Sequence, residues 1–164
     1  MSGMIDVTSK PVMYREAVAE GSIMLKKSTI ELIRQGRVAK GDVITVSRVA
    51  AILACKETSR LIPFCHPIPL THVKVDFEIR EDEVKVRVSV KTKAETGVEM
   101  EALTGVAMAL LTIWDMVKRY EKNEEGLYPS TVIREIKVVS KVKRALESSI
   151  KNGEGSAETG EGMK

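Results

Sequence analysis

The sequence of 164 residues predicts an α+β domain in which helices cover one face of an antiparallel sheet. Apolar and charged residues alternate in the segments 71–80 and 83–91, which is typical of half-buried strands. The link between them, Glu81-Asp82, is short, so we expect an antiparallel hairpin with one apolar face. An amphipathic helix follows and can supply the apolar surface that this face needs.

The earlier helices are indicated by end signals and apolar spacing. Ser28-Thr-Ile-Glu31 predicts a capping box and Gly36 a stop, so a short helix lies between them. Asp42 is a candidate N-cap for a second helix, and the proline-rich segment after it ends that helix. We expect its buried face to carry the apolar residues that recur at spacings of three and four, namely Val46, Val49, Ala50 and Leu53.

The long helix is expected to begin with a second capping box, Thr96-Gly-Val-Glu99, and to end near Lys122. Its core-facing stripe consists of Leu103, Val106, Ala107, Leu110, Ile113, Trp114 and Val117. A last strand is predicted over about 131–139. Helices packed on one face of such an antiparallel sheet make the domain ferredoxin-like in kind.

Composition narrows the class of protein. Apolar residues at 43% and charged residues at 30% are typical of a globular protein, and we expect one domain over residues 1–151. Residues 152–164 are almost free of apolar side chains and predict a disordered tail. There is no secretory signal, and the two cysteines suggest reduced thiols, so we expect a cytoplasmic protein that does not bind a membrane. A net charge of +3 allows an anionic ligand without indicating a nucleic-acid protein.

The proline-rich connector from Leu61 to Leu70 holds Cys65 and His66 in a stiff, extended backbone. Either the prolines merely shape a buried loop, or they fix the imidazole for a function. Cys55, Cys65, His66 and His72 do not have the spacing of zinc ligands, so we expect no metal site.

Asp115 and Lys118 lie three residues apart and share one face of the long helix. Either they form an ordinary surface ion pair, or the apolar neighbours of Asp115 bury it partly. In the second case burial raises the pKa of Asp115 while the ammonium lowers it, as happens in acid/base groups. Glu101 occupies nearly the same stripe, about 21 Å away along the axis at about 1.5 Å per residue. If both carboxylates function at one small ligand, two copies of the helix must contribute.

Scattered cations are candidates for binding phosphate. Lys40 precedes a helix start, Lys56 precedes the proline connector, and Arg15 lies in the N-terminal third. Each could equally be a solvated surface residue. The sequence has no Walker-type or G-x-G-x-x-G loop, so any phosphate site must be assembled from such separate side chains.

Five motifs in order closely resemble the MoaC family of molybdenum cofactor biosynthesis proteins, from about Met4 to about Lys141. They are Met4-Ile-Asp-Val7, Lys40-Gly-Asp-Val43, Leu61-Ile-Pro-Phe-Cys-His-Pro67, Thr96-Gly-Val-Glu-Met-Glu-Ala-Leu-Thr104 and Leu111-Thr-Ile-Trp-Asp-Met-Val-Lys118. The resemblance implies a cyclic pyranopterin monophosphate synthase, a lyase that converts (8S)-3′,8-cyclo-7,8-dihydroguanosine 5′-triphosphate to cyclic pyranopterin monophosphate and pyrophosphate. It also implies a hexamer, a trimer of dimers with interfacial active sites.

The resemblance assigns roles to residues of this sequence. Asp115 is implied as the catalytic acid/base, with Lys118 and Lys40 as catalytic lysines. The implied substrate-binding residues are Phe64, Cys65, His66, Glu99, Met100 and Glu101, with Arg15 and Lys56 for the triphosphate. No cofactor is certain, and whether Mg²⁺ accompanies the triphosphate stays open.

This sequence departs from the family pattern in two places that bear on the site. Glu95 stands where a lysine is frequent, and a Gly-Gly-Lys-Ser element near the family's end is missing. We expect Ser140-Lys-Val-Lys143 to continue into a helix instead. Two rival classes, a nucleic-acid-binding domain and a ligand-sensing regulatory domain, would show no turnover of the triphosphate. A nucleic-acid-binding domain of this fold would also need aromatic residues exposed on its sheet for base stacking. Here aromatics are only 4%, and Phe77 lies on the apolar side of its strand.

Overall fold

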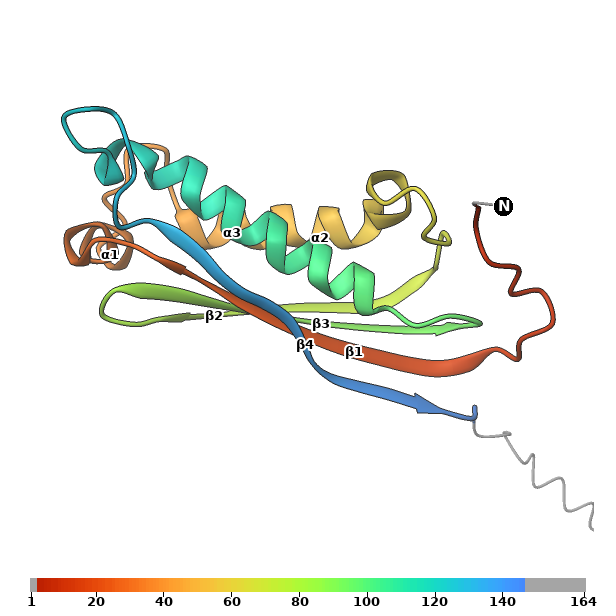
Figure 1. The fold of residues 1–164 in the computed structure, drawn as a ribbon. Helices are drawn as coiled ribbons and strands as arrows, with labels where there is room; N and C mark the ends of the chain where they lie inside the picture. The colour runs from red at the N-terminus through yellow and green to blue at the C-terminus, as the bar shows by residue number, and fades with distance from the viewer. Residues whose placement is uncertain (1–2, 147–164) are drawn as a thin grey trace, which may run out of the picture.

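The computed structural model describes residues 3–146, which form the elements β1-α1-α2-β2-β3-α3-β4 (Figure 1). Their bounds are β1 Met13–Met24, α1 Lys27–Arg34, α2 Val43–Leu61, β2 Leu70–Ile79, β3 Glu83–Ala94, α3 Glu99–Glu121 and β4 Val132–Arg144. The expected tail, 152–164, and the expected domain end at residue 151 lie outside the described residues.

The four strands form one sheet in the order β2-β3-β1-β4, with every neighbouring pair antiparallel. Helices α2 and α3 lie side by side over one face of this sheet (Figure 1). The strand order and the single helical layer are those of a ferredoxin-like fold, so the predicted fold class is confirmed. The predicted hairpin corresponds to β2 and β3, which pair from Ile79↔Val84 onward.

The core lies between the sheet and α3. Val84, Val86, Val88 and Val90 of β3 are fully buried, as the period-two pattern predicts. From the helix, Val106, Leu110, Ile113 and Val117 are fully buried as well. By length and composition α3 could cross a membrane, but its apolar stripe is used here as the packing surface of a core helix.

Strand β1 was not predicted, and both expected capping boxes were wrong. The first helix begins one residue before Ser28, with Lys26 at its N-cap and no side-chain capping bond. Val98 occupies the N-cap of α3, and the Thr96 hydroxyl bonds to the carbonyl of Gly97 instead. The N-cap of α2 is confirmed, because Asp42 accepts a hydrogen bond from the Thr45 amide at 2.9 Å.

The expected buried stripe of α2 was also wrong. Val46, Val49 and Leu53 are 44%, 52% and 55% exposed. The buried face of α2 carries mostly small residues, namely Val43, Ser47, Ala51, Ala54, Cys55 and Thr58. Small side chains let α2 approach α3 closely: a Cβ placed on Gly105 would lie 2.5 Å from Cys55 Sγ. The larger residues therefore remain outside.

Strand β4 is longer and more irregular than predicted. Ser140-Lys-Val-Lys143 continues the strand rather than starting a helix, because its backbone pairs with β1 as far as Arg144. The pairing is interrupted twice by register shifts, and Glu135 within one of them has a φ of 52°. Such a bulge bends an edge strand and turns its side chains to new directions.

Candidate active site

Three charged side chains meet near the C-terminal end of α3. Lys40 Nζ lies 2.6 Å from Asp115 Oδ2, and Lys118 Nζ lies 2.7 Å from Asp115 Oδ1. Lys40 Nζ also donates to the main-chain oxygen of Asp115 at 2.9 Å. Each carboxylate oxygen thus binds a different ammonium group. The three residues that the resemblance names as catalytic are therefore brought together.

The expectation that Asp115 is partly buried was wrong, since its side chain is 56% exposed. The apolar residues that precede and follow Asp115 in the sequence lie on other faces of the helix. Hydrogen bonds from Lys118 and then Lys40 lower the pKa of Asp115 to about 2, and the same contact raises the pKa of Lys118. At neutral pH Asp115 is therefore ionised, and the protons in this cluster are carried by the ammonium groups.

A second group of candidate residues surrounds the N-terminal end of α3. Glu101 is 4% exposed, and among the described residues its Oε2 has no hydrogen-bond partner. Burial raises the pKa of Glu101. Burial, and then the charge of Glu101, raise the pKa of both thiols, that of Cys55 to about 12. A buried carboxyl that favours its protonated form can donate a hydrogen bond at a pH where most carboxyls cannot.

Glu99 and Arg15 lie at the same end. Lys141 Nζ binds Glu99 Oε1 at 2.7 Å, whereas Arg15 donates to the carbonyls of Ala94 and Glu95 at 3.1 and 2.6 Å. Burial is the largest single influence and acts to raise the pKa of Glu99. The Lys141 hydrogen bond, a backbone amide hydrogen bond and the charges of Lys141 and Arg15 together outweigh it, so the pKa is lowered. Sequence reasoning missed Lys141, because it placed this residue in a helix instead of on a strand beside β1.

The proline connector holds its side chains at this end too. His66 Nε2 lies 2.8 Å from the carbonyl oxygen of Ile5 in the N-terminal arm. A carbonyl only accepts, so Nε2 carries a proton and Nδ1 is the nitrogen left for another partner. A cavity of about 220 Å³ beside His66 is lined also by Val7, Pro67, Ile68, Pro69, Ala94, Glu95 and Thr96. Phe64 and Met100 are exposed, Cys65 is half-buried, and Lys56 lies on the exposed side of α2.

The two groups do not meet within one chain. Asp115 follows Glu101 by fourteen residues on one straight helix, which separates them by about 21 Å. Figure 1 shows the loop before α2, which carries Lys40, at one end of the helical layer and the proline connector at the other. Among residues 3–146 no group of three His, Cys, Asp or Glu side chains is arranged to hold a metal ion.

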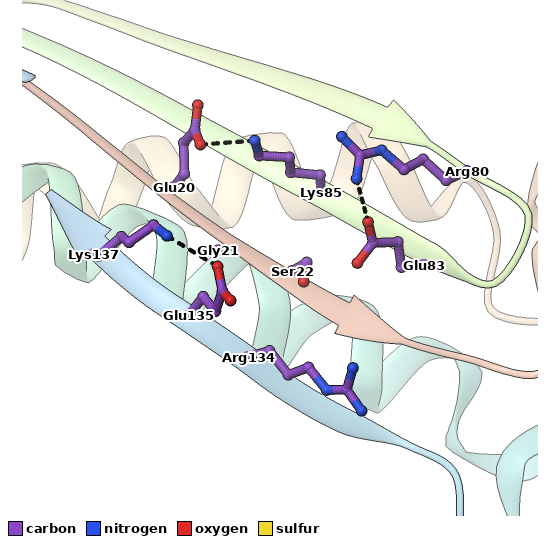
Figure 2. A pocket seen from close by; sticks show the side chains of 9 residues that line it. All are labelled: Glu20, Gly21, Ser22, Arg80, Glu83, Lys85, Arg134, Glu135 and Lys137. Carbon is purple, nitrogen blue, oxygen red and sulfur yellow. Dashed lines mark hydrogen bonds and ion pairs between the residues drawn. The ribbon is translucent and has the colours of Figure 1, made fainter. Parts of the chain in front are cut away.

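A further hollow of about 280 Å³ lies on the opposite face of the sheet and contains none of the candidate residues (Figure 2). Figure 2 shows Lys85, Arg80 and Lys137 turned toward carboxylates of the hollow, whereas Arg134 points away from them. Lys85 binds Glu20 at 2.8 Å, Arg80 binds Glu83 at 2.6 Å, and Lys137 binds Glu135 at 3.0 Å. Because these charges largely neutralise each other, we do not assign the substrate to this hollow.

The fold and the two groups define a ferredoxin-like α+β protein with a carboxylate held between two lysines on its central helix. A family model described as the MoaC family matches residues 4–143. The chain therefore belongs to the MoaC family.

Its relatives are similar over almost their whole length. A protein of Aeropyrum pernix named "Probable cyclic pyranopterin monophosphate synthase" is 59% identical over 142 residues, which cover 87% of this chain and 97% of that protein. A Sulfolobus acidocaldarius protein of the same name is 57% identical over 140 residues, covering 85% and 98%. A Methanothermobacter thermautotrophicus protein, named as a probable synthase accessory protein, is 52% identical over 143 residues, covering 87% and 90%.

Proposed function

We propose that this protein is a cyclic pyranopterin monophosphate synthase of molybdenum cofactor biosynthesis. It converts (8S)-3′,8-cyclo-7,8-dihydroguanosine 5′-triphosphate to cyclic pyranopterin monophosphate and releases pyrophosphate. The names of its relatives support the reaction. The observation that carries it is the binding of both Asp115 carboxylate oxygens to lysine ammonium groups, Lys40 and Lys118.

In this proposal the two lysines carry the protons and Asp115 orients them. A carboxylate with a pKa of about 2 is a weak base at neutral pH, so it is poorly suited to take a proton from carbon, nitrogen or a hydroxyl group. A lysine that gives its proton to the substrate stays beside the ionised Asp115 carboxylate, whose negative charge favours the ammonium form. The lysine therefore readily takes up a proton again, either from another position of the substrate or from solvent. The rearrangement of the guanosine skeleton and the closure of the cyclic phosphate both require such transfers.

We assign substrate binding to the other end of α3. Glu99, Met100 and Glu101 of α3 are assigned to it together with Phe64, Cys65 and His66 of the connector. Cys65 is close enough to Glu101 that burial, and then the charge of Glu101, raise the pKa of its thiol. Arg15 uses Nε and Nη2 for main-chain carbonyls, so Nη1 is the nitrogen proposed to meet the triphosphate. Lys56 adds charge from α2.

We further propose that the active sites lie between two chains of a homohexamer built as a trimer of dimers, which acts in the cytoplasm without nucleic acid or membrane. Two observations support a shared site. The catalytic and binding groups are about 21 Å apart on one helix, and the apolar stripe Val46, Val49 and Leu53 is exposed on a single chain. A two-fold axis crossing the helices sets α3 antiparallel to its copy, so that Glu101 of one chain approaches Asp115 of the other.

The direct test is turnover by the purified protein of the cyclised dihydro-GTP, followed by pyrophosphate release and by formation of the pterin. Lys40→Ala should abolish most of the activity, whereas Lys137→Ala, on the far face of the sheet, should retain it. If the protein alone releases no pyrophosphate while the substrate is intact and the protein folded, it is not the synthase. Such a result would favour the accessory role named for one relative.

A further inference from the structure

Lys40 lies on the loop between α1 and α2, and the ion pair with Asp115 is a weak means of fixing it. Both side chains are about half exposed, with 45% and 56% of their surfaces accessible. Exposed ion pairs contribute little, because solvent screens them and a long lysine side chain loses freedom when it is held. The loop also contains two glycines with positive φ, Gly36 at 64° and Gly41 at 102°. The position of Lys40 therefore depends on how the backbone beside it is held.

The side chain of Tyr120 anchors this backbone. The amide of Ala39, immediately before Lys40, donates to the Tyr120 hydroxyl oxygen at 2.9 Å. Tyr120 lies on α3, five residues after Asp115, and its ring is half-buried against the core. The helix therefore carries both the carboxylate that binds the Lys40 ammonium and the hydroxyl that binds the backbone of the preceding residue, Ala39.

The hydroxyl is itself well fixed. The carbonyl of Tyr120 accepts a hydrogen bond from Lys26 Nζ at 3.1 Å, and the Arg119 guanidinium lies 5.6 Å from the centre of the Tyr120 ring. A ring that packs against the core and a main chain that is bonded at the helix end leave the hydroxyl little freedom. The loop is also held by the buried side chain of Val38 and by backbone hydrogen bonds of Gly36, Arg37 and Gly41 to carbonyls of α1 or of the loop itself. The Tyr120 hydroxyl adds a rigid reference point on α3 for the backbone next to Lys40.

We propose that Tyr120 is a positioning residue for Lys40. It does not touch the substrate, and it affects the reaction only by holding Lys40 in place. This inference rests on the proposed function, because it concerns the lysine assigned there to proton transfer. Proton transfer depends on donor and acceptor being held within hydrogen-bond reach, and small displacements of a reacting group lower the rate steeply. Loss of one such hydrogen bond should reduce the fraction of enzyme with Lys40 in place, and kcat with it, by about three- to tenfold.

The test is Tyr120→Phe, which keeps the ring and removes only the hydroxyl. We expect kcat to fall by about three- to tenfold, with KM within about twofold and the melting temperature lowered by no more than about 5 °C. Tyr14→Phe is the matched control: it also removes a short hydroxyl hydrogen bond, 2.7 Å to Glu16, but in β1 and not beside Lys40. Its kcat should match that of the unmodified protein.

Hydrogen exchange of residues 36–42 separates this inference from the proposed function. Exchange in this loop should quicken in Tyr120→Phe and not in Tyr14→Phe, whether or not the protein turns over the triphosphate. Unchanged kcat and unchanged exchange in Tyr120→Phe would overturn the positioning role. A fall of more than about 10 °C in melting temperature together with a changed KM would also overturn it, because that pattern indicates general structural damage. Faster exchange without any turnover by the unmodified protein would leave the anchor intact and reject the synthase.

Discussion

Two inactive variants should restore each other's activity if each active site combines two chains. Glu101→Ala removes the buried carboxyl at one end of α3, and Asp115→Asn removes the ionised carboxylate at the other. We expect each variant alone to lose at least about a hundredfold in turnover. Glu101 is assigned to substrate binding, and the loss of Asp115 disables the two lysines that it orients for acid/base catalysis. A dimer that contains one chain of each kind then has one site with both residues mutated and one site with both intact.

The expected recovery follows from this count. Random reassembly of equal amounts gives heterodimers for about half of all dimers, and half of their sites are intact, so activity should return to about one quarter of the unmodified value. The 14-residue separation on one helix, about 21 Å, is what forces the two residues of one site onto different chains.

The assay is pyrophosphate release after joint dissociation and reassembly of the two variants. A mixture of Lys40→Ala with Asp115→Asn is the matched control, since these two side chains are in contact within one chain at 2.6 Å. No heterodimer from that mixture contains an intact site, so it should stay inactive. If the first mixture also stays inactive although mass spectrometry shows heteromers, the interfacial site is refuted. Recovery in the control mixture would show instead that Lys40 serves the partner's site.

Three further predictions concern contacts within a single chain and do not depend on its assembly. Gly105→Ala should lower the free energy of unfolding, measured in urea, by about 1–2 kcal/mol, because the new Cβ would meet Cys55 Sγ at 2.5 Å. Adding Cys55→Ala should recover most of this loss. If it does not, the contact with Cys55 is not the cause. Glu135→Gly should stabilise by about 0.5–1 kcal/mol, because a φ of 52° is strained for glutamate, and a lower melting temperature would contradict this. The pKa of Asp115 is lowered from 3.8 to about 2, so its contribution to stability is present above pH 3.8 and is lost as the pH falls through 2. Asp115→Asn should therefore flatten the stability profile across this range, and an unchanged profile would show that the ion pairs do not form in solution.

The parts of the fold that follow a single strong period could be predicted. The β2–β3 hairpin and α3 each bury one face against this chain, so their patterns match their burial. Strand β1 could not be found in this way. Ala17, Val18 and Ala19 are buried on both faces at the centre of the sheet, which hides the alternation. Gly21, with low strand propensity, is required there because a Cβ would lie 2.9 Å from Val106.

The site could be predicted only where its residues are close in sequence. Asp115 and Lys118 are found by their spacing on one helix face, but Lys40 is 75 residues away from Asp115. Its place in the sequence made it only a candidate phosphate-binding cation, and the family resemblance alone grouped it with Asp115. The burial of Asp115 was misjudged because its sequence neighbours were treated as spatial neighbours. Successive helix residues turn by about 100°, so Ile113 and Met116 can be buried while Asp115 faces outward.

The stripe on α2 shows what periodicity does and does not establish. Val46, Val49 and Leu53 recur as regularly as the buried residues of α3, yet they lie on the outside of the chain. A periodic apolar face indicates that the face is buried in the assembled protein, but it does not identify the surface that covers it. An apolar hollow lined by Leu53, Leu61 and Met108 continues this face across α2 toward α3. Covering it with a second copy would bury the same helical layer that carries Glu101 and Asp115 at its two ends. The exposed stripe on α2 and the separation of Glu101 from Asp115 are therefore both explained by a second copy of this chain. Mixing the Glu101→Ala and Asp115→Asn variants tests both explanations.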